Sequence, residues 1–265
     1  GAFAKILKEV AAIDGLERLR FMSPHLRDFT DDVIEVMATT PVVMPHLHMP
    51  LQSGSDSILA SMRRSYRSDR YLGILDRVRS QIPHAMITTD IIVGFPGESE
   101  SDFQATLDVA TRARFAAAYT YKYSIRPGTP AGEMTNQVSE DVVGERYTRL
   151  HEHQQKVSLS VNHDAIGTQH RILVTEVEGR RDAVQSRLTG RSEDFRLVHF
   201  DNTSLARPGD FVDVEITEAS AHYLIARELS HIKTRGGDAH ARRTEVSTPT
   251  PGVMLGIPSF TKVKV

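Results

Sequence analysis

Along the first 162 residues, hydrophobic and polar positions switch repeatedly between a helical repeat and a strand-like repeat. Phe3, Ile6, Leu7, Val10 and Ile13 are spaced as one face of a helix. The same pattern predicts further helices at Asp31–Met37, Asp56–Arg64, Asp69–Gln81, Glu100–Arg114 and Glu140–Val161. Short apolar runs between them predict strands at Leu16–Met22, His46–Leu51, Met86–Val93 and Ala118–Ser124. Strands and helices that alternate at this spacing form a parallel sheet covered by helices, so we expect an α/β unit of the β/α-barrel kind.

The predicted strands of this unit number four, which is too few to close a barrel. The first helix begins close to the start of the sequence, and no Ser, Thr, Asp or Asn precedes it as an N-cap. We therefore expect residues 1–162 to be the C-terminal part of a larger β/α barrel. N-caps of later helices are predicted at Ser55, Ser68, Ser99 and Ser139.

After about Asn162 the pattern changes to short strand-like runs separated by Gly, Asp, Asn and Pro. These runs are Arg171–Val177, Ala183–Leu188, Phe195–Phe200, Phe211–Ile216 and Tyr223–Ala226. They predict a small antiparallel five-stranded β-barrel over residues 163–228. Residues 229–265 show little periodicity and are expected to form a flexible tail.

Composition narrows the function classes. The chain has 265 residues, of which 40% are apolar and 25% charged, and no apolar run approaches the roughly 20 residues of a membrane span. We expect a cytoplasmic protein without membrane contact. The chain contains no Cys, which excludes disulfides, thiolate metal sites and Cys nucleophiles. A formal charge of −2 does not by itself indicate a nucleic-acid-binding protein.

Asp90 interrupts the apolar strand within the stretch TTDIIVGFPGES, residues 88–99. A carboxylate inside such a run is costly unless it has hydrogen-bonding partners. Gly94 and Gly97 then permit close approach of the backbone at the C-terminal end of the strand, where parallel β/α folds bind ligands. Asp90 is therefore a candidate for accepting hydrogen bonds from a ribose, and a structural Asp bonded to a neighbouring strand is the alternative. Glu98 follows in a turn that is expected to expose it.

Two more segments carry candidate polar groups. The loop Gln52–Ser55 offers an amide, two hydroxyls and a glycine, which suit a ribose or an amide, or form an ordinary capped βα loop. Arg63 and Arg64 end the next helix, where one Arg could bind a carboxylate. Arg126 lies in a loop stiffened by Pro and Gly, which suits a loop facing a cofactor or substrate.

His46 and His48 lie two residues apart and share one face of a predicted strand. Such a pair can hold a metal in barrel hydrolases, but that use requires further ligands. Asp90 is the one other inward candidate, so we expect no metal site and interpret the histidines as lining a cavity or packing in the core.

Taken in order, PLQSGSD, MRRSY, TTDIIVGFPGES and YSIRPGTPA resemble the radical S-adenosylmethionine methylthiotransferases, most closely the MiaB type. Residues 163–228, which include GRSEDFRLVHF and PGDFVDVEI, resemble the TRAM module that ends these enzymes. The resemblance implies a partial radical-SAM-type barrel followed by a TRAM-like barrel. It also implies methylthiolation of an isopentenyl-type adenosine next to the anticodon of tRNA, by an enzyme that is monomeric.

The resemblance assigns cofactor-binding roles to several residues. Gln52 and Asp90 would contact the ribose of S-adenosylmethionine, with Ser53 beside them. Arg64 would bind the methionine carboxylate, and the backbone around Gly94–Gly97 would lie near the adenine. The family's enzymes also hold two [4Fe–4S] clusters through Cys residues, in a CxxxCxxC loop and in an N-terminal domain. Because this chain has no Cys, we expect it to ligate neither cluster, to contain no catalytic residue and to be inactive by itself.

RNA contacts are expected from arginines, because phosphates dominate RNA affinity. Residues 163–228 contain eight Arg and no Lys against twelve Asp and Glu, a formal −4, so a local patch is needed. The candidates are Arg126, Arg180, Arg187, Arg191 and Arg196. Alternatives that the sequence leaves open are a stand-alone RNA-binding or scaffold protein, a metal-dependent hydrolase, and relatives of this family that modify a ribosomal protein or threonylcarbamoyl-adenosine.

Overall fold

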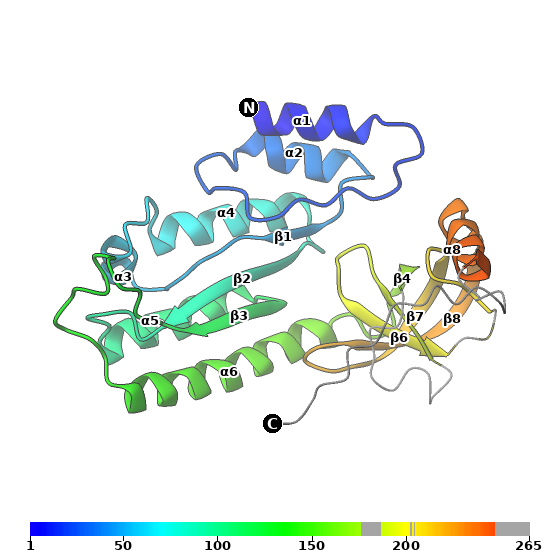
Figure 1. Cartoon of the computed structure of the whole chain (residues 1–265). Helices are drawn as coiled ribbons and strands as arrows, with labels where there is room; N and C mark the ends of the chain where they lie inside the picture. The colour runs from blue at the N-terminus through cyan, green and yellow to red at the C-terminus, as the bar shows by residue number, and fades with distance from the viewer. Residues whose placement is uncertain (176–186, 202, 204, 247–265) are drawn as a thin grey trace, which may run out of the picture.

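A computed structural model describes residues 1–175, 187–201, 203 and 205–246 of the chain. Within these ranges, a parallel sheet with helices forms the first part of the molecule and a closed β-barrel forms the second (Figure 1). The long helix α6 (Glu140–His163) leads from one part to the other.

The described part of the parallel sheet has three strands in the order β1-β2-β3. They are β1 (His46–His48), β2 (Met86–Val93) and β3 (Ala117–Lys122). The other helices of this part are α1 (Ala2–Ala11), α2 (Asp31–Thr39), α3 (Asp56–Ser61), α4 (Ser68–Gln81) and α5 (Glu100–Ala113). The predicted alternation of strands and helices is confirmed from β1 onward.

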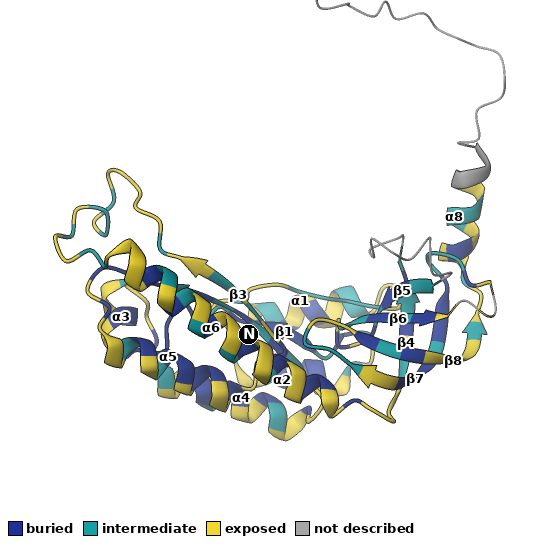
Figure 2. Cartoon of the chain, turned by 90° about the horizontal axis from the view of Figure 1, so that it is seen from below, coloured by how far each residue is buried: buried dark blue, intermediate teal, exposed yellow. Residues whose placement is uncertain are grey.

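Strand β2 shows how the sequence pattern divides the two faces of the sheet. Ile87 and Ile91 are buried in the core that the sheet shares with the helices, whereas Thr88, Asp90 and Ile92 lie on the opposite, partly open face. The helices pack in sequence order, α1 on α2, α2 on α4, α4 on α5 and α5 on α6. They show buried residues on one side and exposed residues on the other (Figure 2). The apolar residues of the strand recur at every second position and those of the helices follow the helical repeat. Both sets are therefore buried in one layer between the sheet and the helices.

Three of the four predicted serines are N-caps, and two of these form a side-chain capping bond. Ser55 accepts a hydrogen bond from the backbone of Ile58, and Ser99 forms a capping box with Asp102 at the start of α5. Ser139 is the N-cap of α6 but makes no side-chain capping bond. Ser68 is already the first residue of α4, after Arg67.

The second part is a closed barrel with the strand order β4-β5-β6-β8-β7. Its strands are β4 (Gln169–Val174), β5 (Arg187–Arg191), β6 (Leu197–Asp201), β7 (Phe211–Ala219) and β8 (Leu224–Ile232). The predicted five-stranded barrel is confirmed, but its pairing is not purely antiparallel, because β6 and β8 run parallel. A closed ring with an odd number of strands cannot alternate in direction all the way round, so one parallel pair is unavoidable.

Two predicted segments differ in kind from the structure, and a third lies partly outside the described residues. Leu16–Met22 forms no strand in this structure, and its one ladder contact is a bridge between Leu19 and Val43. Strand β8 continues to Ile232 because it pairs with β7 as far as Phe211, and helix α8 (Arg235–Val246) follows. Strand and helix therefore occupy most of residues 229–246, the described part of the stretch that was expected to be a flexible tail. Part of the predicted strand Ala183–Leu188 lies outside the described residues, and β5 begins at Arg187.

The barrel lies at the N-terminal ends of the parallel strands. Arg18 donates hydrogen bonds to the carbonyls of Arg171 and Arg191, and Arg20 donates to the carbonyl of Ser192. The ring of His46, the first residue of β1, lies 5.2 Å from that of Phe195. The C-terminal ends of the strands therefore point away from the barrel (Figure 1).

Candidate functional site

A cavity of about 740 Å³ lies at the C-terminal ends of β2 and β3. Its walls are formed by the loop after β1, the end of α3, strands β2 and β3, and the loop after β3. Four of the sequence-predicted site residues line it together: Gln52, Arg64, Asp90 and Arg126. The volume lies within the range of about 300–1,000 Å³ that is usual for small-molecule sites.

Gln52 reaches the cavity through an unusual backbone conformation. Its φ is +71°, and its backbone is held on both sides by β2, since its N–H donates to the Asp90 carbonyl and its carbonyl accepts from Ile92. Arg63, which lines the same cavity, also has a positive φ of +57°. Such conformations are costly for residues with a side chain and concentrate at functional sites.

Asp90 lies on the open face of the sheet, and its side chain is 26% exposed. The one charged or titratable partner recorded for its carboxylate among the described residues is His48, whose Nε2 lies 3.5 Å from Oδ2. His48 belongs to β1, so the structural alternative of an Asp bonded to a neighbouring strand is met by this one contact, which leaves the rest of the carboxylate unpaired among the described residues. The carboxylate is free to accept hydrogen bonds from a ligand.

The two histidines lie on the same face as Asp90 and share a hydroxyl. Thr88 Oγ1 is 2.9 Å from His48 Nδ1 and 3.2 Å from His46 Nε2. Burial, followed by the nearby Arg20 and His48, lowers the pKa of His46 to about 4, so this ring is neutral at pH 7. In the part of the chain that the structure describes, no group of three or more His, Asp or Glu is placed to hold a metal ion.

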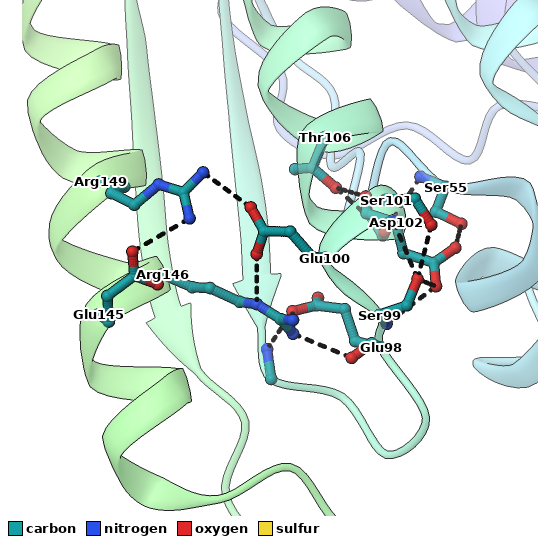
Figure 3. Close-up of polar contacts among 12 residues, drawn as sticks. Ser55, Glu98, Ser99, Glu100, Ser101, Asp102, Thr106, Glu145, Arg146 and Arg149 are labelled. Atoms are coloured by element: carbon teal, nitrogen blue, oxygen red, sulfur yellow. Dashed lines mark hydrogen bonds and ion pairs between the residues drawn. The ribbon is translucent and has the colours of Figure 1, made fainter.

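The glycine turn after β2 is held in place by Glu98, which the sequence predicted to be exposed to solvent. Glu98 is buried, with a side chain that is 1% exposed, because Arg146 of α6 donates to its Oε1 over 2.9 Å and Gly94 N–H donates over 3.1 Å (Figure 3). Burial raises the pKa of the Glu98 carboxyl, and these hydrogen bonds oppose the shift. The expectation of an exposed Glu98 was wrong, because its partner lies 48 residues further along the chain.

Gly94 and Gly97 do not line the cavity, although Phe95 between them does. Both have positive φ, and a Cβ on Gly94 would lie 2.4 Å from Val143 Cγ2 of α6. A Cβ on Gly97 would lie 2.5 Å from Asn136 Nδ2. These contacts give both glycines a packing role in addition to any ligand.

Ser53 also faces away from the cavity. It is fully buried, its hydroxyl lies 3.4 Å from Thr106 Oγ1, and a Cβ on Gly54 would lie 2.5 Å from the Ala105 carbonyl. The loop after β1 is thus pressed against α5.

Asp102, which the sequence did not single out as a site residue, joins two of the loops that border the cavity (Figure 3). Its Oδ1 accepts from Ser55 and Ser57, and its Oδ2 accepts from the hydroxyl and N–H of Ser99. Burial opposes ionisation, but these hydrogen bonds prevail and hold the pKa of Asp102 well below its ordinary value. The capping-box spacing from Ser99 was the one sequence signal that pointed to it.

The candidate RNA-binding arginines do not form one group, although Arg191 and Arg196 line the same pocket. Arg126 lines the cavity, whereas Arg187, Arg191 and Arg196 belong to the barrel at the other end of the sheet. Arg196 forms a buried ion pair with Asp194, and Arg187 lies 3.6 Å from Asp201. Arg191 lies over the Phe195 ring, and Arg180 is outside the described residues.

Comparison with known families gives two matches. The Radical SAM superfamily matches residues 2–110, and the TRAM domain matches residues 165–229. A solved structure titled as coproporphyrinogen III oxidase (HemN) from Escherichia coli, a radical SAM enzyme, aligns over 92% of this chain and 58% of that chain, with a TM-score of 0.45 and 11% identity. A likeness at this level carries no argument about function.

Curated relatives are much more similar. A tRNA-2-methylthio-N(6)-dimethylallyladenosine synthase from Nocardia farcinica is 57% identical over 97% of this chain and 52% of its own length. The protein of the same name from Mycolicibacterium gilvum is 58% identical over 98% of this chain and 51% of its own length. The chain thus spans about half the length of these relatives. In the ranges that the structure describes, every helix is too short or too polar to span a lipid bilayer.

Proposed function

We propose that this chain belongs to the radical S-adenosylmethionine methylthiotransferases and that it supplies the cofactor cavity and the RNA-binding barrel of a tRNA methylthiotransferase. The proposed reaction is methylthiolation of a dimethylallyl-type adenosine next to the anticodon, as the names of the relatives suggest. The parent enzyme would act as a monomer on the anticodon arm, in the cytoplasm, where tRNA is found.

The observation that carries the proposal is the set of polar groups that meet in one cavity. Asp90 offers a carboxylate whose one described side-chain partner is His48 at 3.5 Å, Gln52 offers an amide, and Arg64 offers a guanidinium. These groups match the ribose hydroxyls and the methionine carboxylate of S-adenosylmethionine. The apolar ring of Phe95 supplies part of the wall.

When bound next to a reduced iron–sulfur cluster, S-adenosylmethionine supplies the radical on which this superfamily's chemistry depends. This chain's own residues would bind the ribose and carboxylate and orient the cofactor. They include no Cys, and therefore no thiolate for a cluster. We propose that the two [4Fe–4S] clusters of the active enzyme are held by residues outside this sequence, and that this chain does not catalyse the reaction by itself.

Isothermal titration of the full chain with S-adenosylmethionine tests the cofactor assignment. Asp90→Asn should weaken binding about tenfold, or about 1.4 kcal/mol, because hydrogen bonds to a charged acceptor are worth about 1.5–3 kcal/mol and Asp90 is partly exposed. Asp108→Asn is the matched control, since Asp108 is exposed on α5 and is not among the cavity residues. Equal affinities for the wild type and Asp90→Asn, or no binding by the folded chain, would refute the assignment.

A further inference from the structure

Cations gather at the mouth of the cavity. Arg63, Lys122 and Arg126, here called the cationic rim, come from the end of α3, the end of β3 and the loop after β3. Arg64 lines the same cavity, and Asp90 is the one acidic residue in its described lining. The mouth therefore carries an excess of positive charge around a single carboxylate.

The rim is exposed and its charges are not neutralised. All three side chains belong to exposed residues. Among the residues that the structure describes, no carboxylate lies within ion-pair distance of any of them. Lys122 contacts the ring of Tyr147 at 5.4 Å, an interaction that leaves its charge in place. The rim is thus available to an anionic partner.

The barrel shows the opposite arrangement. Most of its described arginines are paired with a carboxylate within the barrel or on α8, as in Arg171 with Asp213 at 2.8 Å and Arg227 with Glu215 at 2.7 Å. Arg196 is also largely buried against Asp194. Because phosphate binding depends on cations that can replace counterions, paired arginines contribute less to RNA affinity than free ones.

The rim cations and the barrel arginines also lie at opposite ends of the parallel strands. The barrel lies at the N-terminal ends of the strands and the rim at the C-terminal ends (Figure 1). A nucleotide that enters the cavity therefore has its own phosphates next to the rim. Tyr121 lines the cavity beside the rim and is 52% exposed, and exposed aromatic rings between cations are typical of sites for unpaired nucleotides.

We propose that the cationic rim binds the phosphates that flank the target adenosine, in the single-stranded loop of the RNA. The proposal rests on the proposed function and makes it specific, because it assigns the main electrostatic contacts to Arg63, Lys122 and Arg126 rather than to the barrel arginines. The partner is a single-stranded RNA segment, recognised through its phosphodiesters.

Fluorescence anisotropy with the full chain and a labelled anticodon stem-loop RNA, titrated over a series of salt concentrations, tests this proposal. Arg63→Gln with Arg126→Gln should weaken binding about tenfold or more and reduce the salt slope by about 1.4, the value for two lost contacts to a single strand. Arg227→Gln removes an exposed but paired barrel charge and should change affinity less than twofold. Unchanged melting temperatures would show that the variants are folded.

The possible outcomes distinguish a failure of the rim assignment from a failure of the proposed function. If the double variant kept the affinity and salt slope of the wild type, the rim assignment would be overturned while RNA binding remained intact. A larger loss of RNA affinity in Arg187→Gln than in the double variant would have the same consequence. Absence of RNA binding by the folded wild type at low salt would overturn both the rim and the RNA part of the proposed function, whereas the titration with S-adenosylmethionine would be unaffected. Equal, rim-dependent binding of polyglutamate would identify a site for acidic proteins and refute the RNA assignment.

Discussion

Asp102 accepts hydrogen bonds from the loop after β1 and from the loop after β2, although its side chain never enters the cavity. One carboxylate thereby fixes the distance between the loop that carries Gln52 and the loop that carries Phe95. A carboxylate that accepts several hydrogen bonds is stabilised in its charged form, which explains its lowered pKa despite burial.

Asp102→Asn should lower the free energy of unfolding by about 2 kcal/mol at pH 7, the magnitude of hydrogen bonds to a charged group. The folded-state pKa of Asp102 is depressed, so its contribution is fully present above the ordinary Asp value of about 3.9 and is lost as pH falls toward the folded value. Urea denaturation should therefore show a gap between wild type and Asp102→Asn that shrinks below pH 4. A gap that persists unchanged at pH 2, or an equal effect of Asp108→Asn, would contradict this account.

At the scale of elements, the turn after β2 is fastened to helix α6. Glu98 and Arg146 form a buried ion pair, and Gly94 lies against Val143 with no space for a side chain. The turn can approach the helix this closely because glycine accepts a φ of +78° and has no Cβ. The wall of the cavity at Phe95 is positioned by this contact.

Gly94→Ala should destabilise the protein more than Gly167→Ala, a matched control with a φ of +81° and open space around its Cβ position. The control carries the backbone strain of about 1–2 kcal/mol, and Gly94→Ala adds about 1–3 kcal/mol of overpacking. Urea denaturation measures both variants. Val143→Ala in the Gly94→Ala background should recover part of the loss, and no recovery would argue against the steric explanation.

At the scale of the whole molecule, two arginines join the barrel to the sheet. Arg18 and Arg20 donate to carbonyls of the barrel, and Arg20 also lies over the Phe195 ring at 4.6 Å. Burial, followed by the nearby Arg18, lowers the pKa of Arg20 to about 10, which still leaves it charged at pH 7. The two parts have separate apolar cores, and charged donors on backbone acceptors are among the contacts that hold them together.

Arg20→Ala should loosen this contact and increase hydrogen exchange at the amides of Ser192 and Phe195, whose turn it stabilises. The expected local cost is about 1–2 kcal/mol, or a roughly tenfold faster exchange. Arg27→Ala is the control, because Arg27 is exposed and the one carboxylate near its guanidinium among the described residues is that of Asp28. Exchange at these amides that is identical in wild type and Arg20→Ala would show that the barrel is held by other contacts.

The periodicity of the sequence predicted much of the fold and part of the site. Strand β2 has its predicted bounds, α5 differs by one residue, and the five-stranded barrel was expected from its short runs. Gln52 and Asp90 were placed together because the C-terminal ends of parallel strands meet at one edge of a sheet, whereas Arg64 was assigned to the same site by the family resemblance. Alternation, capping and turn residues act between near neighbours, so the sequence alone determined these features.

Tertiary structure decided which side chains those features bring together. Nothing near Glu98 in the chain predicts its burial, because Arg146 reaches it from a helix 48 residues away. Ser53 faces α5 rather than the cavity for a similar reason, because its hydroxyl lies next to that of Thr106 on this helix. The arginines of the barrel and of the rim look alike in the sequence, and only the folded chain shows which carry carboxylate partners. Ion pairing depends on distances of a few ångströms between segments that are remote in the chain, and local pattern contains no information about those distances.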